Sequence, residues 1–151
     1  MITHFSYQEA REMIRSGYIE VQSLTYDMHQ SISLDPTDRV RESVKPLEGE
    51  SEEEYIEALR KDYLAFDYSL FNNTGFRTYS VAYPHGEYTE QSEAVFKSLG
   101  TYITFSTDFT GRNILEQGNT DTLRALCRFT ISEGISADAL IPMIEAVYSD
   151  K

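Results

Sequence analysis

Two short segments of the sequence combine imidazole, carboxylate and phenol groups, the side chains that bind metals and move protons. The first segment is Ser23–His29, with the sequence SLTYDMH, and the second is Ala82–Tyr88, with the sequence AYPHGEY. They contain His29 and His85, two of the three histidines of the chain. Neutral imidazole is a common metal ligand and a frequent acid or base in catalysis. These segments are therefore the first candidates for a functional site.

Hydrophobic periodicity and turn residues place both segments directly after predicted strands. Four strands are expected, at Tyr18–Gln22, Thr78–Ala82, Tyr102–Ser106 and Leu123–Ile131. Four helices are expected, at Ser6–Ser16, Glu52–Phe71, Thr89–Gly100 and Ser136–Val147. In the last helix Pro142 lacks a backbone donor, so the regular part is expected to begin downstream of it.

Strands that alternate with helices are typical of a parallel sheet, because each crossover helix returns the chain to the same end of the sheet. Ligands of such folds bind at the carboxyl ends of the strands. We call the three segments expected there the rim: Leu24–His29, Tyr83–Tyr88 and Thr107–Asn113. Spacing and topology therefore predict that His29 and His85 lie on the same side of the molecule.

The longest predicted helix carries an apolar stripe that marks the core. Ser51 and Glu54 form a capping box at its start, as Ser6 and Glu9 do at the first helix. Apolar side chains then recur every three or four residues, at Tyr55, Leu59, Tyr63, Phe66 and Leu70. This stripe is expected to pack against the sheet and not to bind a ligand.

The composition excludes several classes of function. With 13 basic and 25 acidic residues the formal net charge is −12, whereas binding to nucleic acid or to an anionic membrane needs a basic surface. No apolar run approaches the roughly 20 residues of a membrane span. Cys127 is the only cysteine, so no internal disulfide can form, and it is expected to be a small buried side chain.

The two segments resemble loop motifs of the polysaccharide deacetylases (the NodB-homology group, carbohydrate esterase family four). In the branch that deacetylates poly-N-acetylglucosamine, the first loop usually has the sequence SHTYDLH, against SLTYDMH here. The stretch Ala82–Gly86 is similar to a family stretch that usually has tyrosine in place of His85. Further similarity, which extends the resemblance over about residues 3–147, lies at Glu12–Gly17, Glu53–Asp62, Gly111–Asn113 and Leu126–Phe129.

The resemblance implies metal-assisted hydrolysis of N-acetyl groups, with a divalent ion such as zinc held by one Asp and two His, and a second Asp as general base. Here Leu24 stands where the first histidine is expected, and His29 where the second is. The adjacent Asp pair of the family ends a strand that would precede Ile2, and neither Asp27 nor Asp108 occupies a matching position. The family's tryptophan near the acetyl group has no counterpart, since the chain contains none. We therefore expect no catalytic residue in this chain, and at most a weak, partial metal site at His29.

The other candidates each have two interpretations. Tyr83, Pro84, His85 and Gly86 are either a substrate-binding loop inherited from the family or a structural turn. His85 is a substrate contact, a substitute metal ligand or an exposed loop residue, and His29 is a residual ligand or an ordinary residue of the rim. Three residues are expected to have no role in catalysis: Asp108 in a polar loop, Arg128 as an internal salt-bridge partner and His4 in solvent.

The predicted fold class is α/β, a partial, distorted (β/α) barrel with parallel strands and crossover helices. It forms a single domain, residues 1–151, corresponding to the C-terminal part of a polysaccharide deacetylase-like domain. The resemblance implies removal of N-acetyl groups from an amino-sugar polymer, with this truncated chain inactive by itself, so that whether it is an enzyme stays open. The alternative is a non-catalytic carbohydrate-binding or interaction module, in which Tyr83, Tyr88 and Tyr102 offer aromatic faces to sugar rings.

Part of a barrel would leave a strand edge unpaired, so a homodimer or higher self-association is expected. The family is usually exported or found at the cell envelope. The N-terminal residues show neither the basic nor the apolar region of a signal peptide, so the sequence assigns no location.

Overall fold

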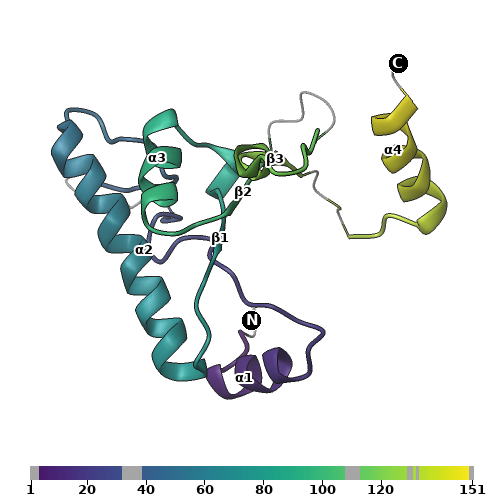
Figure 1. The fold of residues 1–151 in the computed structure, drawn as a ribbon, viewed down its shortest axis with the longest axis horizontal. Helices are drawn as coiled ribbons and strands as arrows, with labels where there is room; N and C mark the ends of the chain where they lie inside the picture. The colour runs from purple at the N-terminus through teal and green to yellow at the C-terminus, as the bar shows by residue number, and fades with distance from the viewer. Residues whose placement is uncertain (1–3, 32–38, 108–112, 129–130, 132, 150–151) are drawn as a thin grey trace.

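The structure is a computed structural model that describes residues 4–31, 39–107, 113–128, 131 and 133–149. The sheet has three strands, and Figure 1 shows helices α2 and α3 beside it. The predicted α/β class is thereby confirmed. The elements, where η marks a short 3₁₀ helix, are α1 (Tyr7–Arg15), α2 (Glu52–Thr74), β1 (Ser80–Ala82), η1 (Pro84–Gly86), α3 (Glu90–Ser98), β2 (Ile103–Ser106), η2 (Thr120–Leu123), β3 (Leu126–Cys127) and α4 (Ala137–Ser149).

The sheet has the strand order β1-β2-β3, and both strand pairs are parallel. Ala82 pairs with Phe105, and Phe105 pairs in turn with Leu126. Helix α3 connects β1 to β2, because parallel neighbours need a long crossover connection. The carboxyl ends of the three strands therefore lie along one edge of the sheet.

Helix α2 begins at Glu52, where its sequence predicts, and continues three residues past the predicted end at Phe71, to Thr74. The Ser51 hydroxyl accepts the Glu54 amide, and the Glu54 carboxylate accepts the Ser51 amide, which completes the predicted capping box. The helix ends at Gly75, whose φ of +83° is the left-handed conformation that glycine adopts without steric cost. The capping box at Ser6 and Glu9 is also present.

The core lies between α2, α3 and the sheet. Four residues of the predicted stripe, Tyr55, Leu59, Tyr63 and Leu70, are buried, and Phe66 is partly buried. The stripe packs with side chains from the sheet, from α3 and from the segments before α2, namely Val81, Tyr83, Val95, Phe96, Met28 and Val44. The expectation that these aromatic residues form a core is confirmed.

The strand predicted at Tyr18–Gln22 is wrong. Tyr18 is 93% exposed, and the first paired residue is Ser23, in an isolated parallel bridge to Val81. The reason lies in the Gln22 side chain, whose amide oxygen accepts the backbone amides of Tyr79 and Ser80, each at 3.1 Å. A side chain thus takes the place of a backbone strand along this part of the sheet edge.

The last strand and the last helix also differ from the sequence prediction. Within the described residues, the strand expected over Leu123–Ile131 is Leu126–Cys127. It begins later than predicted because Leu123 belongs to η2 and Ala125 has a φ of +50°, which an extended strand cannot contain. Residues 129–130 of the predicted range lie outside the described residues. Helix α4 begins at Ala137 and continues through Pro142, so the proline does not move the regular part downstream. Cys127 is half-buried and not fully buried.

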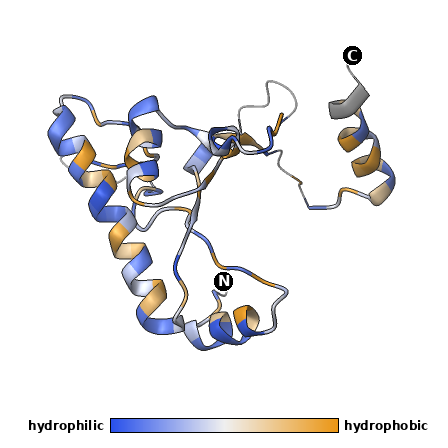
Figure 2. Ribbon diagram, viewed as in Figure 1, coloured by the Kyte–Doolittle hydropathy of each residue, from blue (hydrophilic) through white to orange (hydrophobic). Residues whose placement is uncertain are grey.

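Helix α4 stands away from the sheet in Figure 1, and Figure 2 shows that much of it is hydrophobic. Ile141, Met143 and Ile144 are all exposed on it. Within the described part of the chain, no helix has the length and apolar character that crossing a membrane requires.

Candidate functional site

Backbone hydrogen bonds at the sheet edge bring the rim segments Leu24–His29 and Tyr83–Tyr88 together. The Ser23 amide donates to the Ser80 carbonyl at 3.2 Å, and the Ser23 carbonyl accepts the Ala82 amide at 2.8 Å. Since Ala82 ends β1, both segments leave the sheet at its carboxyl end. The predicted proximity of these two segments is confirmed, whereas most of the third rim segment, residues 108–112, lies outside the described residues.

A carboxylate from α2 fixes the path of the first loop. Asp62 is buried and accepts the amides of Tyr26 at 2.8 Å and Asp27 at 2.6 Å. Burial raises the pKa of Asp62, and the two amides oppose that shift. Thr25 has a φ of +72°, which costs a non-glycine residue conformational energy, and the Met28 side chain is buried in the core. The loop is therefore held at several points, and His29 is exposed beyond them.

The turn after β1 is pressed against the end of β2. A Cβ atom on Gly86 would lie 2.0 Å from the Thr107 hydroxyl oxygen and 2.3 Å from the Thr107 amide nitrogen, so only glycine fits. The Thr107 hydroxyl donates to the His85 carbonyl at 2.9 Å. His85 has a φ of +55°, and its side chain is exposed.

The two loops meet through their histidines. The ring centroids of His29 and His85 are 4.9 Å apart, and the ring planes are at 85° to each other. Beside His85 lies a pocket of about 300 Å³, lined also by Lys45, Glu87, Tyr88 and Thr107. Lys45 Nζ lies 2.8 Å from Glu87 Oε1, and the hydrogen bond between these groups lowers the pKa of Glu87.

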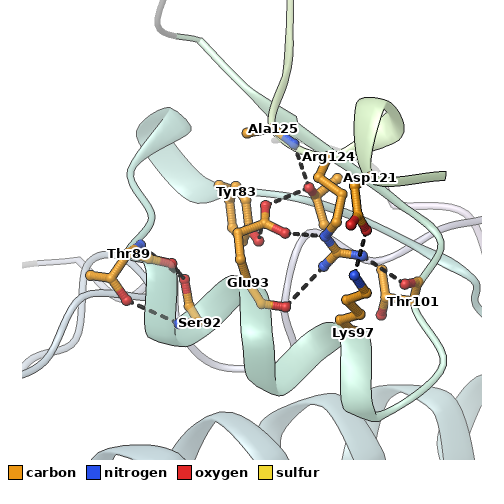
Figure 3. Close-up of polar contacts among 10 residues, drawn as sticks. Tyr83, Thr89, Ser92, Glu93, Lys97, Thr101, Asp121, Arg124 and Ala125 are labelled. Atoms are coloured by element: carbon orange, nitrogen blue, oxygen red, sulfur yellow. Dashed lines mark hydrogen bonds and ion pairs between the residues drawn. The ribbon is translucent and has the colours of Figure 1, made fainter. Parts of the chain in front are cut away.

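Beneath the rim, Tyr83 belongs to a buried polar network, shown in Figure 3. The Tyr83 hydroxyl donates to Glu93 of α3 at 2.8 Å. The same carboxylate accepts the Thr104 hydroxyl and the Arg124 guanidinium. Burial, reinforced by the negative charge of Glu93, raises the pKa of Tyr83.

Arg124 extends this network to the neighbouring segments. Its guanidinium donates to the Thr101 carbonyl at 2.8 Å and to the Glu93 carbonyl at 3.0 Å. The turn after β1, helix α3, strand β2 and the segment before β3 are thereby joined by one set of hydrogen bonds.

Of the four residues predicted to contact substrate, only His85 is exposed. Tyr83, Pro84 and Gly86 are buried, so in this structure they shape the turn and His85 is the side chain that a ligand can reach. The Tyr83 ring stacks on Tyr88, with centroids 5.2 Å apart, and Tyr88 lines the pocket. Tyr102 is 64% exposed but precedes β2, at the opposite end of the sheet from the rim.

The remaining candidates are placed as follows. Leu24 is 42% exposed at the start of the first loop. Arg128, predicted to be a salt-bridge partner, donates instead to the Tyr83 carbonyl at 3.1 Å and pairs with no described carboxylate. Asp108 lies outside the described residues.

The sequence analysis missed three residues that shape the site: Asp62, Glu93 and Arg124. For Asp62 the sequence does contain a signal. It lies three residues after Leu59 and four before Phe66, so its carboxylate falls on the buried face of the helix. A buried carboxylate needs a hydrogen-bonding partner. Glu93 lacks such a signal, because its partner Arg124 lies 31 residues later in the chain.

The described residues do not fit the three-ligand metal centre that the family resemblance implies. Catalytic zinc is usually held by three protein side chains. In the part of the chain that the structure describes, no three His, Cys, Asp or Glu side chains gather closely enough to hold an ion. The aliphatic side chain of Leu24 has no lone pair to donate, so we derive no catalytic step through such a centre.

No family model matches the sequence, and no curated protein sequence matches it. The structure, however, is similar to solved structures. One is a de-N-acetylase from Aggregatibacter actinomycetemcomitans, with a TM-score of 0.71 at 20% identity, covering 91% of this chain and 52% of that one. A second is the BpsB deacetylase domain from Bordetella bronchiseptica, with a TM-score of 0.60 at 20% identity, covering 83% of this chain and 49% of that one.

A third similar structure is IcaB from Ammonifex degensii, with a TM-score of 0.61 at 19% identity, covering 96% of this chain and 53% of that one. The chain thus spans about half the length of the solved chains that it resembles. At this level of identity the likeness establishes the fold that this chain shares with them.

Proposed function

We propose that the chain is a polysaccharide deacetylase-like protein whose rim binds an N-acetylated amino-sugar polymer. The observation that carries this proposal is the fold likeness to a de-N-acetylase over nine-tenths of the chain. The pocket beside His85 supports it, because Tyr88 supplies an aromatic surface there and the ion pair of Lys45 with Glu87 supplies polar groups. Aromatic faces beside polar groups are suited to sugar rings, which combine apolar C–H surfaces with hydroxyls.

The architecture is part of the same proposal. The three parallel strands and the crossover helix α3 are what a segment of a distorted (β/α) barrel contains. The similar solved chains are about twice as long, which supports a partial barrel. We also propose that residues 1–151 form a single domain.

This chain by itself is expected to bind the polymer without hydrolysing it. Leu24 stands where the resemblance expects a metal-binding histidine, and the described residues hold no group of three ligands. These two observations favour the non-catalytic carbohydrate-binding function over N-acetyl hydrolysis.

Nuclear magnetic resonance titration with N-acetylglucosamine oligomers tests the binding. We expect shifts at His85, Glu87 and Tyr88, with weaker shifts for the matching glucosamine oligomers that lack acetyl groups. Tyr88→Ala should weaken binding several-fold, whereas Tyr102→Ala, at the opposite end of the sheet, should leave it unchanged. Binding that follows Tyr102 and not Tyr88 would contradict a site at the rim.

An acetate-release assay with added Zn²⁺ or Co²⁺ tests the absence of hydrolysis. We expect no release above background from chitooligosaccharides or poly-N-acetylglucosamine. Release that co-purifies with the protein and stops on addition of a chelator would show that the chain contains a complete catalytic centre.

A further inference from the structure

Helix α2 carries a second stripe of side chains, on the side turned away from the core. We call it the outer stripe, and all five of its residues are exposed: Glu57, Arg60, Leu64, Tyr68 and Phe71. Tyr68 is 70% exposed, Leu64 49% and Phe71 41%. Residues three and four apart are neighbours on one face of a helix, so the five side chains form one continuous surface.

The helices that pack on α2 leave the outer stripe uncovered. Helix α1 contacts α2 through the hydroxyls of Tyr7 and Ser69, which lie 2.6 Å apart, and α3 packs on the core side through Phe96. Figure 1 shows α2 along one margin of the molecule, with α3 on the side toward the sheet. Exposed large apolar side chains that adjoin one another mark interaction surfaces.

The spacing of the outer stripe is the same in both directions along the helix. From Leu64 the stripe continues by four residues to Arg60 and Tyr68, and by three more to Glu57 and Phe71. A second copy of α2 that ran in the opposite direction, with Leu64 on the two-fold axis, would place Arg60 opposite the partner's Tyr68 and Glu57 opposite the partner's Phe71. Spacings of three and four also suit two helices that cross at a shallow angle. The stripe is therefore complementary to itself in position.

The side chains that would meet are complementary in chemistry as well. Arg60 is exposed and forms no hydrogen bond or ion pair with the described residues, so its guanidinium can stack on the ring of the partner's Tyr68. Glu57 would reach the partner's Arg77, whose guanidinium lies 4.2 Å from the Phe71 ring centroid. The Arg77 side chain is 61% exposed and can therefore accept a second carboxylate beside Asp67.

The charges along α2 favour a second copy of this chain as the partner. Three glutamates, residues 52–54, occupy the first turn of α2, and Arg77 follows its end. Antiparallel packing sets the acidic start of one helix beside the cationic end of the other, and it also opposes the two helix dipoles favourably. The whole chain has a net charge of −12, whereas the outer stripe contains one carboxylate and one guanidinium and is neutral. We propose that the outer stripe is a homodimer interface, in which two α2 helices pack antiparallel about a two-fold axis at Leu64.

One helix face per copy makes a small interface, so the dimer is expected to be weak and to form at micromolar concentrations. The contact involves neither the rim nor strand β3. It therefore does not depend on polysaccharide binding, and it is tested without any sugar.

Disulfide cross-linking of the full chain tests the position of the axis. In a Cys127→Ser background, the Cα atoms of residue 64 in the two copies would lie within about 6 Å, so Leu64→Cys should form a covalent dimer on oxidation. Asn72→Cys is the matched control, because residue 72 is exposed on the same helix outside the outer stripe. Its two copies would lie about 24 Å apart and should stay monomeric. No cross-link in Leu64→Cys, or an equal yield in Asn72→Cys, would overturn the proposal.

A mixture of two variants tests the direction of the helices. Glu57→Cys and Phe71→Cys, in the same background, should cross-link with each other and not with themselves. Efficient cross-linking of Glu57→Cys with itself would indicate a parallel pair and would also overturn the proposal.

Sedimentation equilibrium measures the affinity without a cross-link. Leu64→Lys should weaken dimerisation at least tenfold. An exposed ion pair contributes little by itself, so the second variant reverses a charge: Glu57→Lys, which meets the partner's Arg77, should weaken dimerisation several-fold. Glu42→Lys makes the same change in net charge at an exposed position outside α2 and should not weaken it. Circular dichroism verifies that each variant is folded. Equal dissociation constants in Leu64→Lys and the unmodified chain would place the contact elsewhere.

Discussion

At the scale of single residues, the contact between Gly86 and Thr107 determines the shape of the rim. Gly86 combines a φ of +73° with a position where a Cβ atom would overlap both the side chain and the backbone of Thr107. Gly86→Ala should therefore lower the free energy of unfolding by about 2–4 kcal/mol, through backbone strain and a steric clash together. Chemical denaturation of the two forms measures the difference.

Gly118→Ala is the matched control for this substitution. Gly118 has a φ of +84°, but apart from its two chain neighbours no atom of the described residues lies within 4 Å of its Cβ position. The control should therefore lose only the conformational part, about 1 kcal/mol. Equal losses in the two variants would mean that the contact with Thr107 does not constrain the turn.

The sequence predicted which residues lie on the rim better than it predicted which side chains they contact. His29 and His85 were expected on one side of the molecule, because each follows the end of a predicted strand, and the structure brings them together. The burial of Tyr83 could not be predicted, since its hydroxyl partner Glu93 is fixed only when α3 packs on the sheet. The sequence of the loop motif is the same whether the ring of its tyrosine contacts a sugar or packs in the core.

At the scale of elements, one carboxylate links helix α2 to the loop that carries His29. Asp62→Ala removes both acceptors for the amides of Tyr26 and Asp27. We expect the free energy of unfolding to fall by about 2 kcal/mol, and these two amides to lose their protection against hydrogen exchange.

Glu57→Ala, at an exposed position of the same helix, provides the comparison and should change stability by less than about 0.5 kcal/mol. If the amides of Tyr26 and Asp27 stayed protected in Asp62→Ala, the loop would be held by other contacts, such as the buried Met28 side chain.

The ion pair of Glu93 and Arg124 links helix α3 to the segment before β3. Both side chains are mostly buried, so Arg124→Ala leaves a buried carboxylate without its charge partner and should cost about 3–5 kcal/mol. Combining Arg124→Met with Glu93→Met should cost less than the sum of the two single changes, because neither charge is then left alone. Thermal or chemical unfolding of the four forms completes the cycle.

The pair of Lys97 and Asp121 is the comparison, since both of its side chains are more than half exposed. Lys97→Ala should cost at most about 1 kcal/mol. Strict additivity of the Glu93 and Arg124 substitutions would mean that the buried network does not act as a unit.

Elements with local signals were predictable, and elements defined by distant partners were not. The capping boxes at Ser6 and Ser51 fix the starts of α1 and α2 within four residues of sequence. The segment Tyr18–Gln22 has the composition of a strand. The Gln22 side-chain oxygen, however, accepts the backbone amides of Tyr79 and Ser80 at the sheet edge, which a backbone carbonyl would otherwise accept. Whether a strand pairs there depends on the competition between side-chain and backbone acceptors, which the alternation of polar and apolar residues does not show.

At the scale of the whole molecule, open edges and exposed apolar side chains favour self-association. Strand β3 has a neighbour on one side only within the described residues, and Ile114, Leu115 and Ile141 are each more than half exposed. We expect a dimer or larger assembly, because burial of apolar surface gains about 25 cal/mol per Å². The net charge of −12 opposes association, and salt screens it over about 8 Å at physiological ionic strength.

Light scattering at low and at physiological salt measures the mass. The expected result is a mass above that of the 17.3 kDa chain, rising with salt. A monomer under both conditions would contradict the expectation that this chain leaves an edge open. Because Tyr18–Gln22 does not form a strand, the expected contact surface of the sheet is β3 with its neighbouring segments.

The parallel pairing of the sheet also sets the order in which the molecule can fold. Ser80 pairs with Ile103 and Phe105 with Leu126, so each strand contact closes a loop of more than twenty residues. Helix α2, in contrast, is built from contacts within four residues and can form in about a microsecond. Contacts between distant residues form late, because the entropy of loop closure opposes them until the strands are paired. We therefore expect the surface that carries the two histidines to be the last part of the protein to be completed during folding.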